Sequence, residues 1–380
     1  MIKTFIDRET KVLFALLIVF LFSSNLALFV LGIAGIFVFI NKYLKRQSKN
    51  FVLLLIALLL YFVHGVFING LFNIWGGLMV VLPSIVLYLC GNYFAIRWKY
   101  GEIILFLLFL VSLTIALPHF YYTISDIFQN GLINPHRYLS ILGEDQQIIT
   151  QRAILISLCT GAIGLAPLWS LKGERSVRRL IRFFVALSFV AVLCVIHYVS
   201  RTGVVIFLVS FIVGQYMNSR KSKYRNVFLL IVFCVLLFYV SFETEVGIVF
   251  MERNNDTLFQ ASGRSGKWEL FFNLLLQNPM GIENLAYVTS TYAYAHNLWL
   301  DFGKYGGLLS FVLLSVFSII NIIKCCKVFF NKSRSDILLK QLCFLFAIVF
   351  FLANMTEPIL EGVRPFWFAY CFYCGLTDNL

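Results

Sequence analysis

The sequence predicts an all-α, polytopic membrane protein, and three observations support this. Hydrophobic residues make up 60% of the 380 residues, and charged residues only 13%. Apolar runs recur along the whole chain at lengths that match a bilayer and not a soluble core. Basic residues gather between these runs. Because the hydrocarbon core needs about 20 apolar residues per helix, we expect about twelve transmembrane helices in a single integral membrane domain, residues 1–380.

Each expected span is an apolar run that a short polar or basic stretch ends. The first two are separated only by Ser23, Ser24 and Asn25, so the count depends most on this pair. Lys3 and Asp7 precede the first run and no small-residue cleavage site follows it, which favours a retained helix over a removed signal peptide. The spans are 11–24, 26–41, 51–68, 73–93, 102–118, 152–171, 183–199, 203–217, 226–242, 297–323, 341–355 and 364–377.

The basic residues predict the orientation of the chain. If alternate connections face the cytoplasm, 23 of the 31 Lys and Arg residues fall on that side, and both termini are cytoplasmic. The net charge of +13 then reflects orientation, and we expect no nucleic-acid partner. Eight basic residues remain on the far side and need another reason: Arg137, Arg152, Arg201, Arg253, Arg264, Lys267, Lys304 and Arg364.

The cysteines indicate neither a disulfide nor a metal site. All nine lie in expected spans or in the cytoplasmic Cys325–Cys326 pair, away from an oxidising far side. Their spacing lacks a zinc pattern, so they are expected to be small apolar residues of the helices.

Two far-side segments, 119–151 and 243–296, are longer than a tight connection. In the second, Ser265 can cap a helix over 267–277 (KWELFFNLLLQ), which Pro279 and Gly281 end. A helix of this length is too short to cross a bilayer, so we expect it to lie in the membrane interface.

Three far-side residues lie where the chain approaches the membrane: Arg201 in YVSRTGVV, Arg264 in ASGRSGKW, and His296 in front of the tenth span. Each alone has an ordinary explanation. Arg201 could reach lipid headgroups, Arg264 could be a solvated loop charge, and His296 could hydrogen-bond in the interface. Their occurrence together favours an anion site with a base beside it, because charges at a membrane usually face a polar cavity or a partner.

The residue types define the chemistry that such a site could perform. Two arginines can neutralise a diphosphate without a metal, because each guanidinium offers paired donors and keeps its charge. The far-side carboxylates contain no Asp-x-Asp pair for magnesium, and only Glu144–Asp145 could hold one weakly. Histidine, with an unperturbed pKa near 6.5, suits proton abstraction from a hydroxyl. The set therefore predicts transfer from a lipid diphosphate to an alcohol.

The order of these motifs resembles the shared C-terminal region of bacterial O-antigen ligases and O-antigen polymerases. SRTG lies at a short turn, SGR precedes an apolar helix that ends in NPMG, and AHNLWLDFGKYGGLLSF follows, so the resemblance covers about residues 197–320. It implies a GT-C-like, inverting glycosyltransferase of the bacterial inner membrane, without metal or cofactor. Residues 119–151 and 243–296 would be periplasmic segments, and the active site would be periplasmic.

The resemblance also implies roles for individual residues. Arg201 and Arg264 would bind the diphosphate of an undecaprenyl diphosphate-linked oligosaccharide, and His296 would activate the hydroxyl of the acceptor glycan. Membrane lipids and a chain-length regulator protein are the other expected partners. Further glycan or phosphate contacts are expected from Arg137, His197, Asn297, Glu357 and Arg364.

Polymerase and ligase differ in the acceptor, which is a second lipid-linked repeat unit for the polymerase and the lipid A core for the ligase. Residues 134–137 (NPHR) and 354–364 (NMTEPILEGVR) favour the polymerase, because they suit the walls of a repeat-specific sugar channel. The ordinary alternative for Glu357 and Glu361 is a solvated loop. For His197 it is an interfacial histidine whose hydrogen bonds are satisfied by the protein.

Two functions of other classes also fit about twelve helices with a few embedded charges. A transporter or flippase of lipid-linked sugar would show two similar halves and charges near the midplane, whereas the charges here cluster on one side. A non-catalytic scaffold of an export complex would tolerate His296→Ala and Arg264→Ala without a change in glycan length or amount.

Overall fold

The computed structural model of the chain describes residues 48–70, 73–96, 116–117, 119–132, 139–141, 144–146, 149–170, 175–198, 200–217, 264–282, 295–330, 337–357, 359–362 and 364–378. Nearly all of them are helical, as the composition predicts. The exceptions include two short antiparallel strands, β1 (Leu139–Ile141) and β2 (Glu144–Gln146). The expected spans 11–24, 26–41 and 226–242, and most of 102–118, lie outside the described residues.

Four described helices are long and apolar enough to cross a membrane. They are α3 (Lys49–Val63) with the π-helical segment His64–Ile68 that extends it, α4 (Ile74–Ile96), α7 (Arg175–His197) and α13 (Leu298–Phe330). The apolar part of α7 is Val177–His197. These helices identify a membrane-embedded protein, and the count of twelve spans stays a prediction.

The other described helices are shorter. Apolar stretches of intermediate length occur in α6 (Ile149–Thr160) with its 3-10 continuation Gly161–Ser170, in α8 (Arg201–Met217) and in α14 (Ile337–Thr356). The remaining helices are α11 (Arg264–Gln277), α15 (Ile359–Gly362) and α16 (Arg364–Asp378). The helix expected over 267–277 is thus present as α11, and it begins at Arg264, one residue before the expected cap at Ser265. Its place in the membrane interface stays a prediction.

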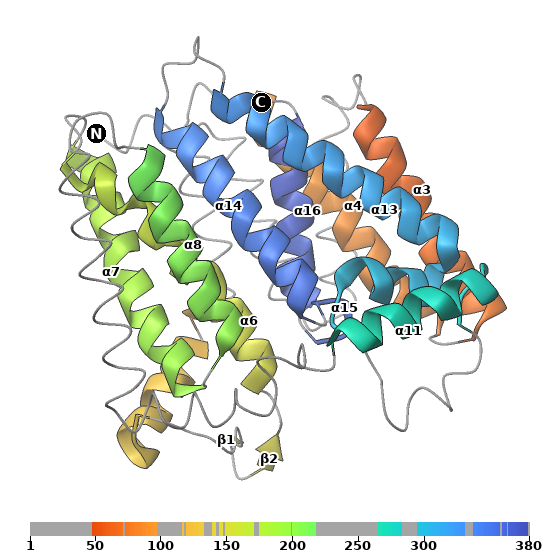
Figure 1. The fold of residues 1–380 in the computed structure, drawn as a ribbon, viewed down its shortest axis with the longest axis horizontal. Coiled ribbons are helices and arrows are strands. Elements are labelled where there is room, and N and C mark those ends of the chain that lie inside the picture. The colour runs from red at the N-terminus through yellow and green to blue at the C-terminus, as the bar shows by residue number, and fades with distance from the viewer. Residues whose placement is uncertain are drawn as a thin grey trace.

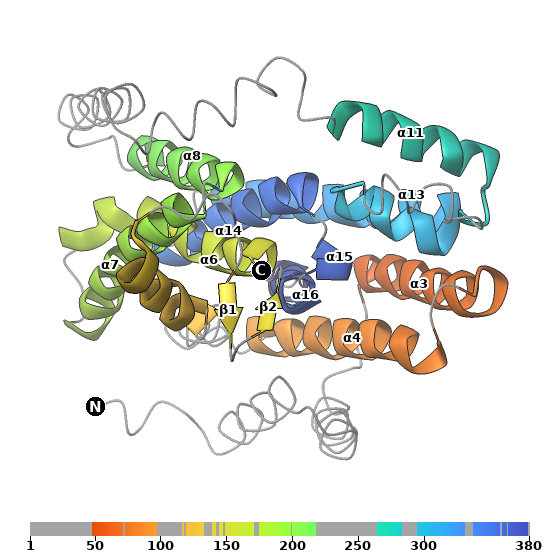
Figure 2. The same cartoon turned by 90° about the horizontal axis from the view of Figure 1, so that it is seen from below.

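Two of the four buried clusters among the described residues hold most of the long helices, and α14 contributes to both. One core contains residues of α3, α4, α13 and α16, and another contains residues of α7, α8 and the 3-10 segment. Phe350 and Ala353 of α14 belong to the first core, and Leu342 and Leu345 to the second. Figure 2 accordingly shows α14 and α16 between α7 and α8 on one side and α3 and α13 on the other.

The contact between α4 and α16 depends on two glycines. A Cβ atom on Gly91 would collide with the carbonyl oxygen of Phe372, and one on Gly375 with that of Tyr88. Small residues of this kind let two helix backbones approach closely within a membrane.

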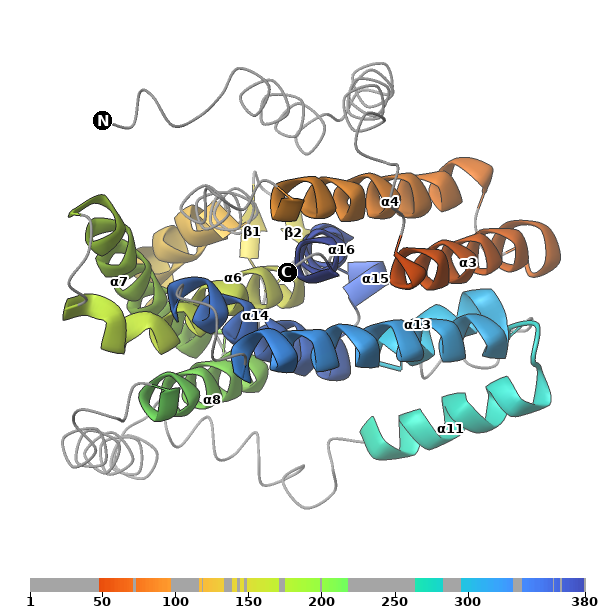
Figure 3. The ribbon, with the colours of Figure 1, turned by 90° about the horizontal axis from the view of Figure 1, so that it is seen from above.

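The long described helices run along the bundle in both directions, which gives it two distinct ends. At one end lie the turn between α7 and α8, the end of α14, α15, the start of α16 and α11 (Figure 1). The starts of α3, α7 and α14 and the end of α13 lie at the other (Figures 1 and 3). We call the first the α7–α8 end, after the short connection between these two helices. Helix α11 packs against α13 and runs across this end at a steep angle to α14.

Candidate functional site

The sequence-predicted site residues that the structure describes all lie at helix ends, and these helix ends lie at the α7–α8 end of the bundle (Figure 1). Arg137 lies outside the described residues. The others either begin a helix, end one, or flank one by a residue or two: His197, Arg201, Arg264, His296, Asn297, Glu357 and Arg364. Helix ends therefore gather these residues from distant parts of the chain.

His296 has an unusual backbone that its neighbours hold in place. Its φ of 54° is the one positive φ of a non-glycine residue among those the structure describes. The carboxylate of Asp301 accepts the N–H of Ala295 at 2.8 Å and the N–H of Asn297 at 3.3 Å. Trp268 Nε1 donates to the carbonyl of Ala295 at 2.9 Å. We call Asp301 and Trp268 the His296 clamp, because their hydrogen bonds fix both peptide neighbours of His296.

The clamp offsets a conformational cost. A non-glycine residue in the left-handed region costs on the order of 1–3 kcal/mol and persists only where the surroundings dictate it. Asp301 has no exposed surface, so its two hydrogen bonds to the backbone are shielded from water. The Nδ1 atom of His296 is buried, while the residue as a whole is half-buried. These hydrogen bonds thus fix the backbone on both sides of His296, while the residue itself is only partly covered.

Asn297, expected as a glycan contact, caps α13. Its Oδ1 accepts the N–H groups of Trp299 at 3.1 Å and Leu300 at 3.2 Å, and the residue is only 7% exposed. An asparagine at this position satisfies N–H groups that the first helical turn leaves open. The pattern of Asn297 followed by an acidic residue in the first turn signals a helix start, and it could have assigned Asp301 from sequence.

Arg264 begins α11 and so stands on a helix, where the sequence suggested a loop. Its side chain is outside the described part of the chain, but its backbone position is informative. Trp268 follows four residues later and shares its helix face. Because Trp268 donates to Ala295, the first turn of α11 lies beside the residue that precedes His296. The amino-terminal end of a helix also favours an anion through its exposed N–H groups.

Arg201 begins α8 after a connection of three residues, as expected for a turn squeezed between two helices. It is partly exposed. The next residue, Thr202, donates to Oε1 of Glu357 at 2.6 Å. Glu357 is only 7% exposed, so the structure places it in a packed contact beside Arg201 and not in a solvated loop. The side chain of Glu361 lies outside the described part.

His197 has no exposed surface and both ring nitrogens are engaged. Nδ1 lies 2.9 Å from the carbonyl oxygen of Leu132, and Nε2 lies 2.6 Å from Oδ2 of Asp126. A carbonyl only accepts, so Nδ1 carries the hydrogen. These contacts hold the helix 119–130 against the turn that carries Arg201. Both ring nitrogens of His197 are therefore used in contacts within the protein. Asp126, which makes one of these contacts, is a residue to which the sequence assigned no role.

Short packed segments connect the Arg201 side of this end to the His296 side. The N–H of Ile359 donates to the carbonyl of Glu357 at 2.9 Å, which turns the chain into α15. Helix α15 packs against both α13 and α16. Arg364, the first residue of α16, is exposed next to it. Glu357, α15 and Arg364 thus lie between the start of α8 and α13, and we call them the bridge.

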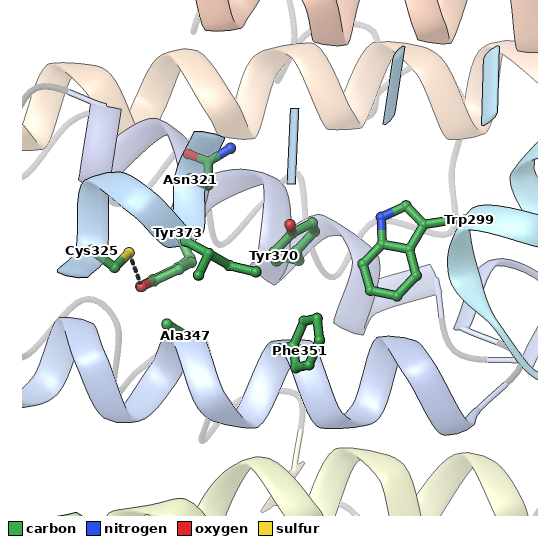
Figure 4. Close-up of a pocket in the computed structure, with 8 residues that line it drawn as sticks. Trp299, Asn321, Cys325, Ala347, Phe351, Tyr370 and Tyr373 are labelled. Carbon is green, nitrogen blue, oxygen red and sulfur yellow. Dashed lines mark hydrogen bonds between the residues drawn. The ribbon is translucent and has the colours of Figure 1, made fainter. Parts of the chain in front are cut away.

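A crevice between α13, α14 and α16 contains none of the predicted site residues (Figure 4). Trp299, Tyr370 and Tyr373 line it, and its volume of about 10 Å³ matches a single water molecule. Its polar groups bind one another: Ser318 accepts from Trp299 at 2.9 Å and from Tyr370 at 3.0 Å, and Cys325 contacts the Tyr373 hydroxyl at 2.7 Å. These hydrogen bonds hold the helices together, and the crevice is too small for a sugar.

Among the residues that the structure describes, no three His, Cys, Asp or Glu side chains gather so that they could hold a metal ion. Comparisons with models of known protein families and with curated proteins give no match for this chain.

Proposed function

We propose that this chain is an O-antigen polymerase, a membrane glycosyltransferase of the bacterial inner membrane. It would transfer a growing glycan from undecaprenyl diphosphate to a hydroxyl of an incoming repeat unit at the periplasmic face. The proposal includes about twelve spans, cytoplasmic termini and an active site at the α7–α8 end.

The His296 clamp is the observation that supports this function most. An ordinary interfacial histidine has no need of a left-handed backbone, nor of buried hydrogen bonds on both sides of it. Strained residues of this kind cluster at functional sites, where the surrounding structure preorganises them. The clamp also ties His296 to α11, the helix that Arg264 begins. A base and an arginine-bearing helix end are therefore built as one unit.

The reaction assigns a separate task to each residue. An acceptor hydroxyl attacks the anomeric carbon of the donor, and His296 takes its proton. The bond between that carbon and the diphosphate oxygen breaks, and undecaprenyl diphosphate leaves with the electron pair. Arg201 and Arg264 stabilise the negative charge that develops on the leaving group. Attack from the face opposite the diphosphate inverts the anomeric configuration, and no acid is required to protonate the leaving group.

The bridge provides the acceptor side in this proposal. Glu357 is fixed by Thr202 beside Arg201, so its carboxylate can accept hydrogen bonds from sugar hydroxyls close to the diphosphate. Arg364 is exposed at the end of the bridge. Arg137 and Asn297 remain proposed contacts.

Deletion of the gene in its native host tests the assignment. The polymerase predicts lipopolysaccharide in which each core carries a single repeat unit. A bare core, with glycan accumulating on the lipid carrier, would identify a ligase instead. Unchanged lipopolysaccharide would refute both.

Complementation of the deletion strain tests the roles of the residues. His296→Ala should insert normally and give no chain extension. Arg201→Lys should be strongly impaired, because lysine keeps the charge and loses the paired donors. Arg175→Lys makes the same change at the opposite end of the bundle and should extend chains normally. Normal chain length with both His296→Ala and Arg201→Lys would contradict the mechanism.

A further inference from the structure

The start of α7 carries a basic face that the proposed reaction does not use. Arg175, Arg178, Arg179 and Arg182 are spaced i, i+3, i+4 and i+7, so they lie on one side of the helix over two turns. All four line one hollow of about 460 Å³. The start of α7 lies at the opposite end of the bundle from the candidate site (Figure 1). We call these four residues the arginine face.

The arginine face is not balanced by α7 itself. Like charges three and four residues apart on a helix repel each other. Cations are also disfavoured at the amino-terminal end of a helix, and the first turn of α7 contains no acidic residue. The Nε atom of Arg178 is buried and has no hydrogen-bond partner among the described residues. A bound anion would relieve each of these unfavourable terms.

The same side of α7 continues as an apolar stripe. Ala186, Phe189 and Leu193 follow Arg182 at steps of four, three and four residues, so they extend the arginine face along the helix. Phe189 is 55% and Leu193 is 51% exposed. The opposite side is buried, and Phe184 lies in the core there. A basic head followed by an exposed apolar stripe complements a phosphate headgroup and its acyl chain, and not a soluble anion.

The length of α7 places the arginine face at the depth of the lipid headgroups. Arg182 and His197 are separated by about 22 Å at 1.5 Å per residue, and Arg175 lies about two further helical turns away. The hydrocarbon core is about 30 Å thick, so the arginine face begins near one edge of the core when His197 lies near the other. Long arginine side chains bridge the remaining distance to the headgroups.

We propose that the arginine face and its apolar stripe form a binding site for an anionic phospholipid. The guanidinium groups hold the phosphate, and an acyl chain lies along Ala186, Phe189 and Leu193. The site is independent of the proposed transferase reaction, because it occupies the other end of the bundle.

Native mass spectrometry of the purified full-length protein tests this site. The protein is mixed with phosphatidylglycerol or with phosphatidylcholine, which differ in headgroup charge. Wild type should retain phosphatidylglycerol in clear excess, and the excess should fall as salt screens the arginines. Each removed arginine should weaken binding about fivefold, the effect expected of one basic residue near an anionic surface. Equal retention of the two lipids by wild type would overturn the proposal.

Variants separate the arginine face from other basic residues. Arg175→Gln and Arg179→Gln, both at exposed positions, should lose most of the excess, singly and together. The matched control is Lys327→Gln with Lys340→Gln, which removes the same charge from α13 and α14 at the same end of the bundle (Figure 1). An unchanged excess in the arginine variants, or an equal loss in the control, would refute the site. Unfolding temperatures in phosphatidylcholine verify that every variant is folded.

A third comparison identifies the source of the phosphate. Phe189→Ser and Leu193→Ser leave all four arginines in place, and they should lower retention of phosphatidylglycerol. Glycerol phosphate and inorganic phosphate should compete only weakly for the wild-type protein. Full competition by either soluble anion, together with no effect of the serine variants, would overturn the lipid in favour of a free phosphate compound.

Discussion

At the scale of single residues, the imidazole of His296 depends on groups that never need to touch a substrate. Asp301 accepts two backbone N–H groups and Trp268 donates to one carbonyl, so three hydrogen bonds define the conformation of residues 295–297. Asn297 uses its own side chain to start α13 directly afterwards. The position of the base is therefore set by the start of a helix. A helix is rigid and can hold the base more accurately than a free loop.

Asp301→Asn tests this dependence. Asparagine keeps the shape but replaces one acceptor by an NH₂ group that faces a backbone N–H. Loss of a buried hydrogen bond of this kind costs about 1–3 kcal/mol of stability. We expect turnover to fall at least tenfold, with little change in the affinity for the lipid-linked donor, because Asp301 acts through the backbone of His296. Steady-state kinetics of purified protein, normalised to the folded fraction, measure this.

Trp268→Phe provides a graded comparison with Asp301→Asn. It keeps the ring and removes one hydrogen bond, so its effect on turnover should be smaller. A folded Asp301→Asn protein with wild-type turnover would show that the clamp has no part in catalysis.

Sequence reasoning could single out some of these residues and not others. His296 and Arg201 are conspicuous because they are polar or charged beside apolar runs. Asp126 and Trp268 are not, since their roles arise from contacts across 71 and 27 residues of chain that only folding brings together. Burial could not be predicted for Glu357. Its neighbours in the sequence resemble those of a solvated loop, and only its contact with Thr202 shows that it is packed.

At the scale of elements, α13 is broken where the sequence suggested one continuous span. Gly307 has φ 80° and ψ 177°, which divides the first nine residues of α13 from the longer helix that follows. The turn after α11 fits into this break: the N–H of Leu308 donates to the carbonyl of Pro279 at 2.8 Å. Asn69 donates to the carbonyls of Met280 and Tyr305, both at 3.2 Å. The NPMG turn, residues 278–281, therefore holds α11 and the segment that follows α3 against the break at Gly307.

Gly307→Ala should loosen this junction. A side chain at this φ is strained, and its Cβ would collide with the carbonyl oxygen of Pro279. We expect a loss of about 1–3 kcal/mol in the free energy of unfolding. Gly266→Ala is the matched control: no atom lies within 4 Å of its Cβ position, and alanine favours the helix. Denaturant unfolding in detergent compares them, and equal stability of the two variants would contradict the role of Gly307.

The presence of a helix could be predicted where residue composition determines it. Breaks and π-helical turns depend on backbone geometry and were harder to predict. The short helix expected over 267–277 is present as α11, because its capping and stop residues surround it in the sequence. The break at Gly307 was not expected, since a Gly-Gly pair within an apolar run also fits a continuous membrane helix. The π-helical segment His64–Ile68 has no composition of its own that distinguishes it from the rest of α3.

At the scale of the whole molecule, the two ends of the bundle differ in chemistry. The α7–α8 end gathers a clamped histidine, a buried carboxylate and the arginines that begin α8 and α16. The opposite end carries the arginine face and the basic residues at the end of α13. This separation agrees with the rule that basic residues accumulate on the cytoplasmic side, and it makes the orientation in the membrane a testable property of the fold.

Thiol labelling in cells measures that orientation. Gln277→Cys introduces an exposed thiol at the end of α11, on the side proposed to be periplasmic. Cys326, near the end of α13, is the one native cysteine among the described residues that is not buried, and it lies toward the opposite end. A membrane-impermeant maleimide should label Gln277→Cys in spheroplasts. Cys326 should react only after lysis, and Cys326→Ser should remove that signal. Labelling of both thiols from the same side would contradict the proposed topology, because a helix that crosses the membrane must separate them.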